Sequence, residues 1–420
     1  MIKPIFTLFI LFSISVSGQD TIRLMHYNLL MYGNDFSGCN SSNNNVFDKN
    51  GYLRTIVDFA KPDIVTVNEI YKDSYYHDLI LDSVFNIEGV DYWARGYPPN
   101  LSNGYTINQV YYNTQLFTLE SNSAVATNIR DIDIFNLSTK FTSTIVDPEI
   151  NLVVAHLKAG SYSENEEERD LETMALMEYL DNNDAIGNYA LLGDLNVYTA
   201  SEQAFINLLF YENEDIRFYD PINKIGEWHN NDYFTDVHTQ STHTSGDCPS
   251  SGGMDDRFDF ILLSDEIIEG TDKMKYLSNS YKAIGQDGQH YNKSLLDPPE
   301  NTSVPEEVLA ALYDMSDHLP VVIDIVVSDD LGVNDPLSSN FNLSFKNPVS
   351  DILEITFDNN QNAEVYFELL NLNGHILYKI NVGQYSNSIT IPTNHLLKGF
   401  YLLKISDGNS SVAYRKVIKF

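Results

Sequence analysis

Short apolar runs separated by turn-forming residues recur from residue 21 to residue 327, and this spacing restricts the folds open to the chain. Most runs have the length and the Val, Ile, Tyr or Phe content of strands. We predict helices at 52–60 and 164–180, among strands at 21–30, 63–67, 104–112, 116–126, 131–138, 151–156, 189–192, 258–263 and 321–327. The pattern predicts an α/β fold in which two packed sheets are flanked by helices.

Charge divides the chain into two parts. The formal net charge is −34, and residues 4–340 hold 53 acidic and 17 basic side chains, a balance of −36. The last 80 residues hold 7 basic and 6 acidic side chains, a balance of +1. An acidic surface repels nucleic acid and anionic lipid at long range, and it suits cation binding and solubility. This contrast predicts two separate modules.

The segment that joins the two parts, residues 328–340, is polar and contains Gly332 and Pro336, which is typical of a linker. Beyond it we expect strands without helices, at 343–346, 352–357, 364–371, 375–382, 387–391, 400–405 and 412–418. Strands at this short spacing predict a small all-β sandwich domain at 341–420.

The first 18 residues have the pattern of a signal peptide. Lys3 supplies a charged start, residues 5–16 are apolar, and Val16-Ser17-Gly18 is an acceptable cleavage site. The apolar run is too short for a transmembrane helix, and no later run reaches spanning length. We therefore expect an exported protein with a signal peptide at 1–18, a large domain at 19–327 and no stable membrane span.

The chain has two cysteines, Cys39 and Cys248. In an exported protein an even count favours a disulfide. Two free buried thiols are the alternative.

Polar residues stand where several of the predicted strands stop. They are Asn28, Glu69, His156, Asp194, Asn196, Asp259, Asp317 and His318. Taken singly, each has an ordinary structural role, because an Asp after Gly commonly caps a turn and a buried His is commonly a satisfied core residue. Their order and their common context at strand ends point to a functional site.

The chemistry of these residues suits hydrolysis of a phosphate ester. Carboxylates are hard oxygen ligands for Mg²⁺, Mn²⁺ or Ca²⁺, and an Asn can add a neutral oxygen. His156 and His318 can act as general acid and base near neutral pH, and Asp259 can hold one imidazole in a fixed tautomer. Such a set favours in-line attack of water, because positioning and charge neutralisation supply most of the rate.

Six segments in chain order carry these residues: Tyr27-Asn28, Asn68-Glu69, His156-Leu157-Lys158, Gly193-Asp194-Leu195-Asn196, Arg257-Phe258-Asp259-Phe260 and Ser316-Asp317-His318-Leu319-Pro320. The ordered set resembles the signature of the endonuclease/exonuclease/phosphatase (DNase I-like) superfamily over roughly 21–326. The resemblance implies a four-layer α/β sandwich with a metal at the strand ends.

The resemblance also implies roles for single residues. Asn28, Glu69 and Asp317 would bind the metal. His318 would be the general base, paired with Asp259.

The remaining positions would handle the substrate. His156 would assist the phosphate or the leaving group as an acid, and Asp194 and Asn196 would place the nucleophilic water and the scissile phosphate. Lys158 and Arg257 would either add positive charge or be solvated at the surface.

The sequence departs from the family pattern after the second predicted strand. Asn68 stands where the family more often has Gln, and Ile70-Tyr71-Lys72 lacks the arginine that DNase I-type nucleases insert into the minor groove. DNase I-style recognition of duplex DNA is therefore in doubt. Residues 286–305 form a long polar loop, either a substrate-side loop or an insertion.

The C-terminal part carries a second resemblance. Its motifs are Phe345-Lys346-Asn347-Pro348-Val349, Leu370-Asn371-Leu372-Asn373-Gly374, Leu396-Leu397-Lys398-Gly399-Phe400-Tyr401 and the basic end with Arg415, Lys416 and Lys419. They resemble the C-terminal sorting domain of the type IX secretion system, which implies contact with that machinery and delivery to the cell surface or beyond. A carbohydrate-binding or Ig-like accessory module is the alternative.

We therefore expect a secreted, monomeric phosphodiesterase that depends on Mg²⁺, or on Mn²⁺ or Ca²⁺, and that acts as an extracellular endonuclease on nucleic acid. Alternatives within the fold are a phospholipid or sphingomyelin phosphodiesterase and a phosphomonoesterase. A surface-binding protein on a catalytically inactive enzyme fold is an alternative from another class, although every expected acid, base and metal position is filled.

Overall fold

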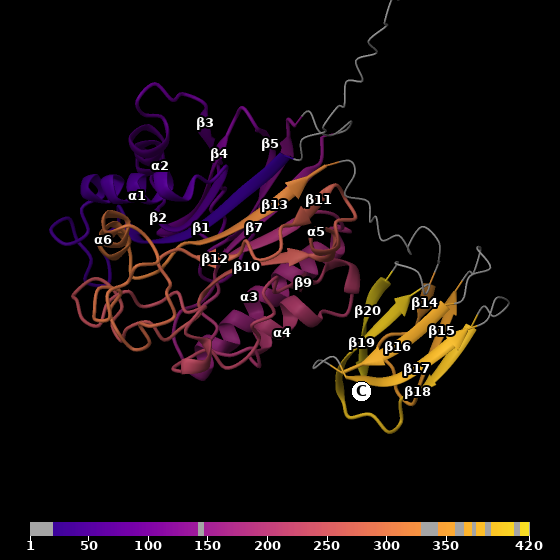
Figure 1. The fold of residues 1–420 in the computed structure, drawn as a ribbon. Helices are drawn as coiled ribbons and strands as arrows, with labels where there is room; N and C mark the ends of the chain where they lie inside the picture. The colour runs from indigo at the N-terminus through magenta and orange to yellow at the C-terminus, as the bar shows by residue number, and fades with distance from the viewer. Residues whose placement is uncertain are drawn as a thin grey trace, which may run out of the picture. The chain divides into compact units, whose positions relative to one another are not determined.

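The computed structural model describes residues 20–141, 147–328, 343–357, 365–371, 375–382, 388–406 and 412–419. The chain divides into two compact units, Met1–Asp329 and Asp330–Phe420 (Figure 1). The predicted signal peptide at 1–18 and all but the first residue of the predicted linker at 328–340 lie outside the described residues.

The larger unit contains two mixed sheets, here called sheet A and sheet B. Sheet A has the strand order β11-β13-β1-β2-β4-β3, with β12 paired to β13. Its strands are β1 (Asp20–Tyr32), β2 (Ile64–Tyr71), β3 (Trp93–Arg95), β4 (Thr106–Asn113), β11 (Met274–Tyr276), β12 (Lys282–Ala283) and β13 (Val321–Val327). Sheet B has the order β5-β6-β7-β8-β10-β9, formed by β5 (Phe117–Val125), β6 (Ile132–Thr139), β7 (Glu149–His156), β8 (Tyr189–Asp194), β9 (Phe218–Tyr219) and β10 (Asp259–Ser264).

Helices cover the outer face of each sheet (Figure 1). Helices α1 (Val46–Ala60), α2 (Ser74–Ile80) and α6 (Glu306–Met315) pack on sheet A, and α3 (Ser163–Asn182) and α4 (Gln203–Phe210) pack on sheet B. The shorter helical segments are η1 (Leu81–Phe85), η2 (Glu214–Ile216), η3 (Asp232–Phe234) and α5 (Asp265–Glu269). The predicted four-layer α/β sandwich is confirmed.

The strands are apolar on both faces because each sheet is covered on both sides. In β1, Ile22 and Leu24 contribute to the core between the sheets, whereas Met25 and Tyr27 contribute to the core beneath the helices. Side chains of a strand alternate between faces. Residues that continue the even-numbered series of β1 therefore point into the space between the two sheets.

Two predicted boundaries move in the structure. Helix α1 begins at Val46, six residues before the predicted start, where the side chain of Asn45 accepts from the backbone N–H of Phe47. Strand β2 continues past Val67 to Tyr71, because its pairing with β4 resumes after a bulge.

Helices α2, α4, α5 and α6 were not predicted. They have 5 to 10 residues, and helices this short depend on packing against a sheet more than on intrinsic propensity.

The described residues of the smaller unit form strands and no helix. One sheet has the order β14-β15-β18 and the other β17-β16-β19-β20. The strands are β14 (Leu343–Phe345), β15 (Ile352–Phe357), β16 (Val365–Leu370), β17 (Ile376–Val382), β18 (Ser388–Pro392), β19 (Gly399–Ser406) and β20 (Val412–Lys419). Buried apolar residues such as Leu353, Phe367 and Leu403 form one core. The predicted small all-β sandwich is confirmed, with all seven expected strands.

Among the described helices, none combines the length and the apolar character that crossing a membrane requires.

Candidate active site

Strand register brings three of the predicted residues together at one edge of sheet B. The parallel pair β7 and β8 places His156 opposite Asp194, and the antiparallel pair β8 and β10 places Asp259 opposite Asp194. All three side chains continue the series of residues that faces sheet A, as Val154 and Leu192 do one step earlier. The site therefore lies at the end of the apolar layer between the two sheets.

Sheet A contributes Asn28 and Glu69 from the adjacent parallel strands β1 and β2. The backbone N–H of Leu30 donates to Asn28 Oδ1 at 3.0 Å, and that of Met31 donates to Glu69 Oε2 at 2.8 Å. Leu30, Met31 and Glu69 all have positive φ, a conformation that costs energy for residues other than glycine. The hydrogen bond from Met31 in this turn holds the Glu69 carboxylate in place.

A buried lysine supports this turn. Lys49 donates from Nζ to the carbonyl oxygen of Leu30 at 2.9 Å and to Asn44 Oδ1 at 2.6 Å. Burial lowers the pKa of Lys49 to about 7, although Asp317 and Glu69 oppose that shift. The Asp317 and Glu69 carboxylates therefore both stabilise the charged form of the buried Lys49 amine.

His318 and Asp259 form a short contact across the two sheets. Nδ1 of His318 lies 2.7 Å from Asp259 Oδ2, and both side chains are buried. Burial lowers the pKa of His318, but Asp259 and Asp194 outweigh it and hold the pKa well above its ordinary value. The Asp259 carboxylate accepts a hydrogen bond from the N–H at Nδ1, and Nε2 faces the site.

Asp317 is fixed by a loop that the sequence did not associate with the site. The backbone N–H of Ser250 donates to Asp317 Oδ2 at 2.8 Å, and Gln240 Nε2 lies 3.2 Å from the same oxygen. Gln240 Nε2 also lies 2.6 Å from Nε2 of His318. Buried Asp317 Oδ1 has no hydrogen-bond partner among the described residues.

The loop that carries Ser250 is covalently tied to the loop after β1. Cys39 and Cys248 form a disulfide, as the even cysteine count favoured. The tie joins segments 209 residues apart and lies two residues from Ser250. The disulfide therefore fastens the rim of the site on the side of Asp317.

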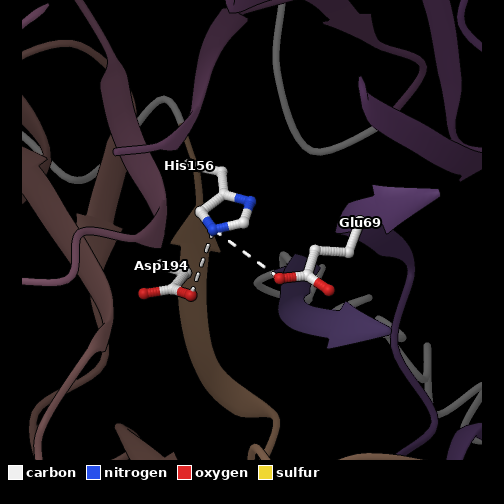
Figure 2. Close-up of side chains that lie close together, drawn as sticks. All are labelled: Glu69, His156 and Asp194. Atoms are coloured by element: carbon white, nitrogen blue, oxygen red, sulfur yellow. Dashed lines mark ion pairs between the residues drawn. The ribbon is translucent and has the colours of Figure 1, made fainter. Parts of the chain in front are cut away.

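His156 meets a different partner. Arg130, in the loop between β5 and β6, places Nη1 2.8 Å from Nδ1 of His156. Nε2 of His156 lies 3.5 Å from Asp194 Oδ2 and 3.7 Å from Glu69 Oε1. Dashed lines in Figure 2 mark both contacts. Burial, followed by the charge of Arg130, lowers the pKa of His156 well below its ordinary value.

Asp194 lies at the centre of the group. Asn28 Nδ2 donates to Asp194 Oδ2 at 3.0 Å, and Asn68 Oδ1 accepts from the Asp194 backbone N–H at 3.0 Å. Burial raises the pKa of Asp194, with His318 opposing the shift and Asp259 adding to it. Asn196, with φ of +50°, donates its backbone N–H to Asp194 Oδ1 at 3.1 Å.

The residues present fit a hard divalent cation. Carboxylate oxygens of Glu69 and Asp194 lie within 4.8 Å of each other, and the unpartnered oxygen of Asp317 is buried. Carboxylates crowded in a buried space need positive charge to offset their repulsion. Of the expected metal ligands, Glu69 lies in this cluster of carboxylates and Asp317 lies outside it. Asn28 turns its amide nitrogen toward the carboxylates, since its oxygen already accepts from Leu30.

The two basic residues of the six segments do not face the site as free charges. Arg257 is fully buried and makes a two-pronged ion pair with Asp220, at 2.8 and 2.9 Å, so neither expected role describes it. Lys158 is partly exposed and donates from Nζ to the carbonyl oxygen of Ala159.

Sequence analysis missed four residues that contact the site: Arg130, Gln240, Lys49 and Asn68. None lies in a motif segment at a strand end, except Asn68, which was noted only as a departure from the family pattern. Asn68 links the sheets, because its nitrogen donates to Asn108 in β4 while its oxygen holds Asp194 in β8. Asn68 alone had a sequence signal, its polarity inside an otherwise apolar strand.

Solved structures of similar shape have low sequence identity to this chain. An endonuclease/exonuclease/phosphatase family protein from Bacteroides thetaiotaomicron is 11% identical with a TM-score of 0.47, over 74% of this chain and 97% of that one. A protein of the same description from Bacteroides vulgatus is 13% identical with a TM-score of 0.47, over 74% and 100%. TDP2 of D. rerio, solved in complex with a single-strand DNA product, is 14% identical with a TM-score of 0.45, over 73% and 98%. Among curated proteins, no match to this sequence is found.

A family model matches the smaller unit. Residues 345–419 match the secretion system C-terminal sorting domain. The match covers the strands β15 to β20 and all four motifs from which the sorting domain was predicted. The chain is therefore an exported protein of the type IX secretion route, and its C-terminal unit is a secretion system C-terminal sorting domain.

Proposed function

We propose that the larger unit is a divalent-metal-dependent phosphodiesterase. The observation that carries this proposal is the pair of His318 and Asp259, joined at 2.7 Å, beside a cluster of buried carboxylates. A general base is common to many classes of hydrolase, so the His318–Asp259 pair by itself does not indicate the substrate. Carboxylates this close to the base would repel an anionic phosphate unless a cation were bound among them.

In the proposed reaction His318 accepts the proton of the attacking water at Nε2. Asp259 holds the ring through Nδ1 and stabilises the imidazolium that forms. Asp194 and Asn196 orient the water and the scissile phosphate, with Asn28 fixing Asp194 from the opposite sheet. A divalent cation held by Glu69, Asp194 or Asp317 would polarise the phosphate and offset the negative charge around His318.

We further propose that the substrate is nucleic acid, preferably single-stranded. Tyr105 is 72% exposed, and Nζ of Lys72 lies 4.9 Å from the centre of its ring. Lys72 follows β2 three residues after Glu69, and its backbone N–H donates to the carbonyl oxygen of Tyr105. An exposed ring paired with a cation near the site can stack a base and attract its phosphate.

One experiment tests both proposals. The purified full-length protein is incubated with single-stranded DNA, plasmid, RNA, sphingomyelin vesicles and inositol phosphates, with EDTA or with Mg²⁺, Mn²⁺ or Ca²⁺. We expect cleavage of single-stranded nucleic acid that EDTA abolishes and a divalent ion restores. The variant Glu69→Gln is nearly isosteric and should lose most activity while remaining folded.

Other outcomes sort the alternatives. If the protein cleaved sphingomyelin but no nucleic acid, the proposed substrate would be wrong and the proposed phosphodiesterase reaction would stand. Cleavage that persists in EDTA would contradict the metal. No hydrolysis of any of these substrates by a folded protein would favour a non-catalytic binding role.

A further inference from the structure

The contact between Arg130 and His156 fixes where the imidazole carries its proton. A guanidinium group has N–H donors and no acceptor, and it keeps its charge in proteins. Nη1 of Arg130 lies 2.8 Å from Nδ1 of His156, so this nitrogen has to accept the hydrogen bond. An imidazolium donates from both nitrogens, and so the contact is compatible only with a neutral ring whose proton is on Nε2.

The groups around the other ring nitrogen agree with this tautomer. Nε2 of His156 faces Asp194 Oδ2 at 3.5 Å and Glu69 Oε1 at 3.7 Å, and both are oxygens that accept a hydrogen (Figure 2). Glu172, whose carboxylate accepts from the backbone N–H of Lys158, lies near enough to Arg130 to favour its charge. The guanidinium is therefore balanced by several carboxylates.

The second histidine of the site has the opposite partner. Nδ1 of His318 lies beside the carboxylate of Asp259, which accepts a hydrogen bond from the Nδ1–H and leaves Nε2 directed at the site. Both imidazoles are equally buried, and their Nε2 atoms approach the same oxygen of Asp194. One ring is thus arranged to take a proton and the other to present one.

We propose, on the basis of the phosphodiesterase function above, that Arg130 is a positioning residue that holds His156 as a neutral hydrogen-bond donor. The N–H at Nε2 donates to a phosphoryl oxygen and gains strength as negative charge develops there. This donor role is proposed in place of the acid role expected from the sequence.

The test reads the tautomer directly. The chain, labelled with isotopic nitrogen at its ten histidines, is studied by nitrogen NMR, and His156→Gln assigns the signals. We expect Nδ1 of His156 to carry no proton and Nε2 to carry one. A proton on Nδ1 of His156 in the folded wild-type protein would overturn the proposal.

Variants of Arg130 add a functional readout. Arg130→Lys keeps a donor, so it should keep the tautomer and much of kcat. Arg130→Glu offers an acceptor, so it should move the proton to Nδ1 and lower kcat by about 10²-fold or more, the scale for losing one preorganised donor. Arg54→Lys and Arg54→Glu are matched controls, because Arg54 donates to the carbonyl oxygen of Ser83 away from the site.

The outcomes separate this proposal from the proposed function. A proton on Nε2 of His156 in a protein that hydrolyses no substrate would contradict the function alone. An active enzyme in which Arg130→Glu folds and leaves the His156 signals unchanged would contradict the positioning role alone. If Arg130→Glu does not fold, the wild-type spectrum and Arg130→Lys still decide.

Discussion

The region around His318 and the region around His156 approach the same carboxylate, Asp194, from the two sheets. The side chains of both histidines are 4% exposed, so burial does not distinguish them. What differs is the group at Nδ1, which is the Asp259 carboxylate in one region and the Arg130 guanidinium in the other. Identical side chains with equal burial thus acquire opposite proton arrangements from a single neighbour each.

A third histidine extends the comparison. His77 in α2 lies between two neutral partners, because Gln109 Nε2 is 2.8 Å from its Nδ1 and its Nε2 is 2.9 Å from the carbonyl oxygen of Tyr71. It also lies outside the carboxylate cluster. His77 is therefore a reference for the two site histidines, because its ring is also buried and hydrogen-bonded at both nitrogens but lies outside the site.

The largest effect is expected from breaking the His318 side. His318→Ala should lower kcat/KM by about 10²–10⁴-fold, because the general base is lost. Asp259→Asn should cost nearly as much, and the double variant should cost no more than His318→Ala, because both changes break the same unit. Kinetics of the four proteins on one cleaved substrate measure this, and additive losses would show that the two residues act separately.

Reducing the disulfide should weaken the same side. The Cys39–Cys248 tie fastens the loop whose Ser250 and Gln240 contact Asp317. Its loss should lower the free energy of unfolding by about 2–4 kcal/mol. Urea unfolding with and without reductant measures this, with Cys39→Ser/Cys248→Ser as the control that reductant should not affect. An unchanged midpoint after complete reduction would contradict the structural role.

Acid should destabilise the fold through His77. Burial lowers the pKa of His77 to about 4, below the ordinary value of 6.5 that the unfolded chain has. The unfolded state therefore binds a proton first, and stability that is complete above pH 6.5 falls as the pH drops toward 4. The loss is at most about 3 kcal/mol, from 1.36 kcal/mol for each pKa unit.

Replacing the ring isolates this contribution. In His77→Gln the amide can still accept from Gln109 and donate to Tyr71, but it does not titrate. Urea unfolding at pH 7 and pH 4.5 should show a smaller acid loss for the variant than for the wild type. Equal losses in both proteins would assign the acid sensitivity to other groups.

The smallest effect is expected from removing the sorting domain. A variant ending at Ser328 should keep kcat/KM within about twofold, since a compact unit with its own core can fold alone. It should no longer be exported by its native host, as cell fractionation would show. A folded variant that lost turnover would make the smaller unit a substrate module.

Much of the fold follows from local pattern. Alternation along β1, β7 and β8 puts Asn28, His156 and Asp194 on the face that bears the core between the sheets, and this can be counted in steps of two from Leu24, Val154 and Leu192. The composition break near residue 340 and the strand spacing after it likewise indicate the second unit. These features can be predicted from the sequence because each depends only on residues that are close together in the chain.

Helix α6 and the bulge at Glu69 show where local pattern stops being sufficient. The ten residues of α6 form a helix by packing Leu309 and Leu312 on sheet A, and the bulge exists because β2 resumes pairing with β4 at Ile70. Both depend on a partner surface that comes from another part of the chain.

The sequence by itself determined which chemical groups end the strands, and the tertiary structure decided what each group can do. Asp259 is 59 residues from His318, and Arg130 is 26 residues from His156. A hydrogen bond depends on distances of a few tenths of an ångström between such segments, and no periodicity encodes those distances. The protonation of an imidazole therefore follows from the neighbour that folding supplies, because that neighbour either donates to Nδ1 or accepts from it.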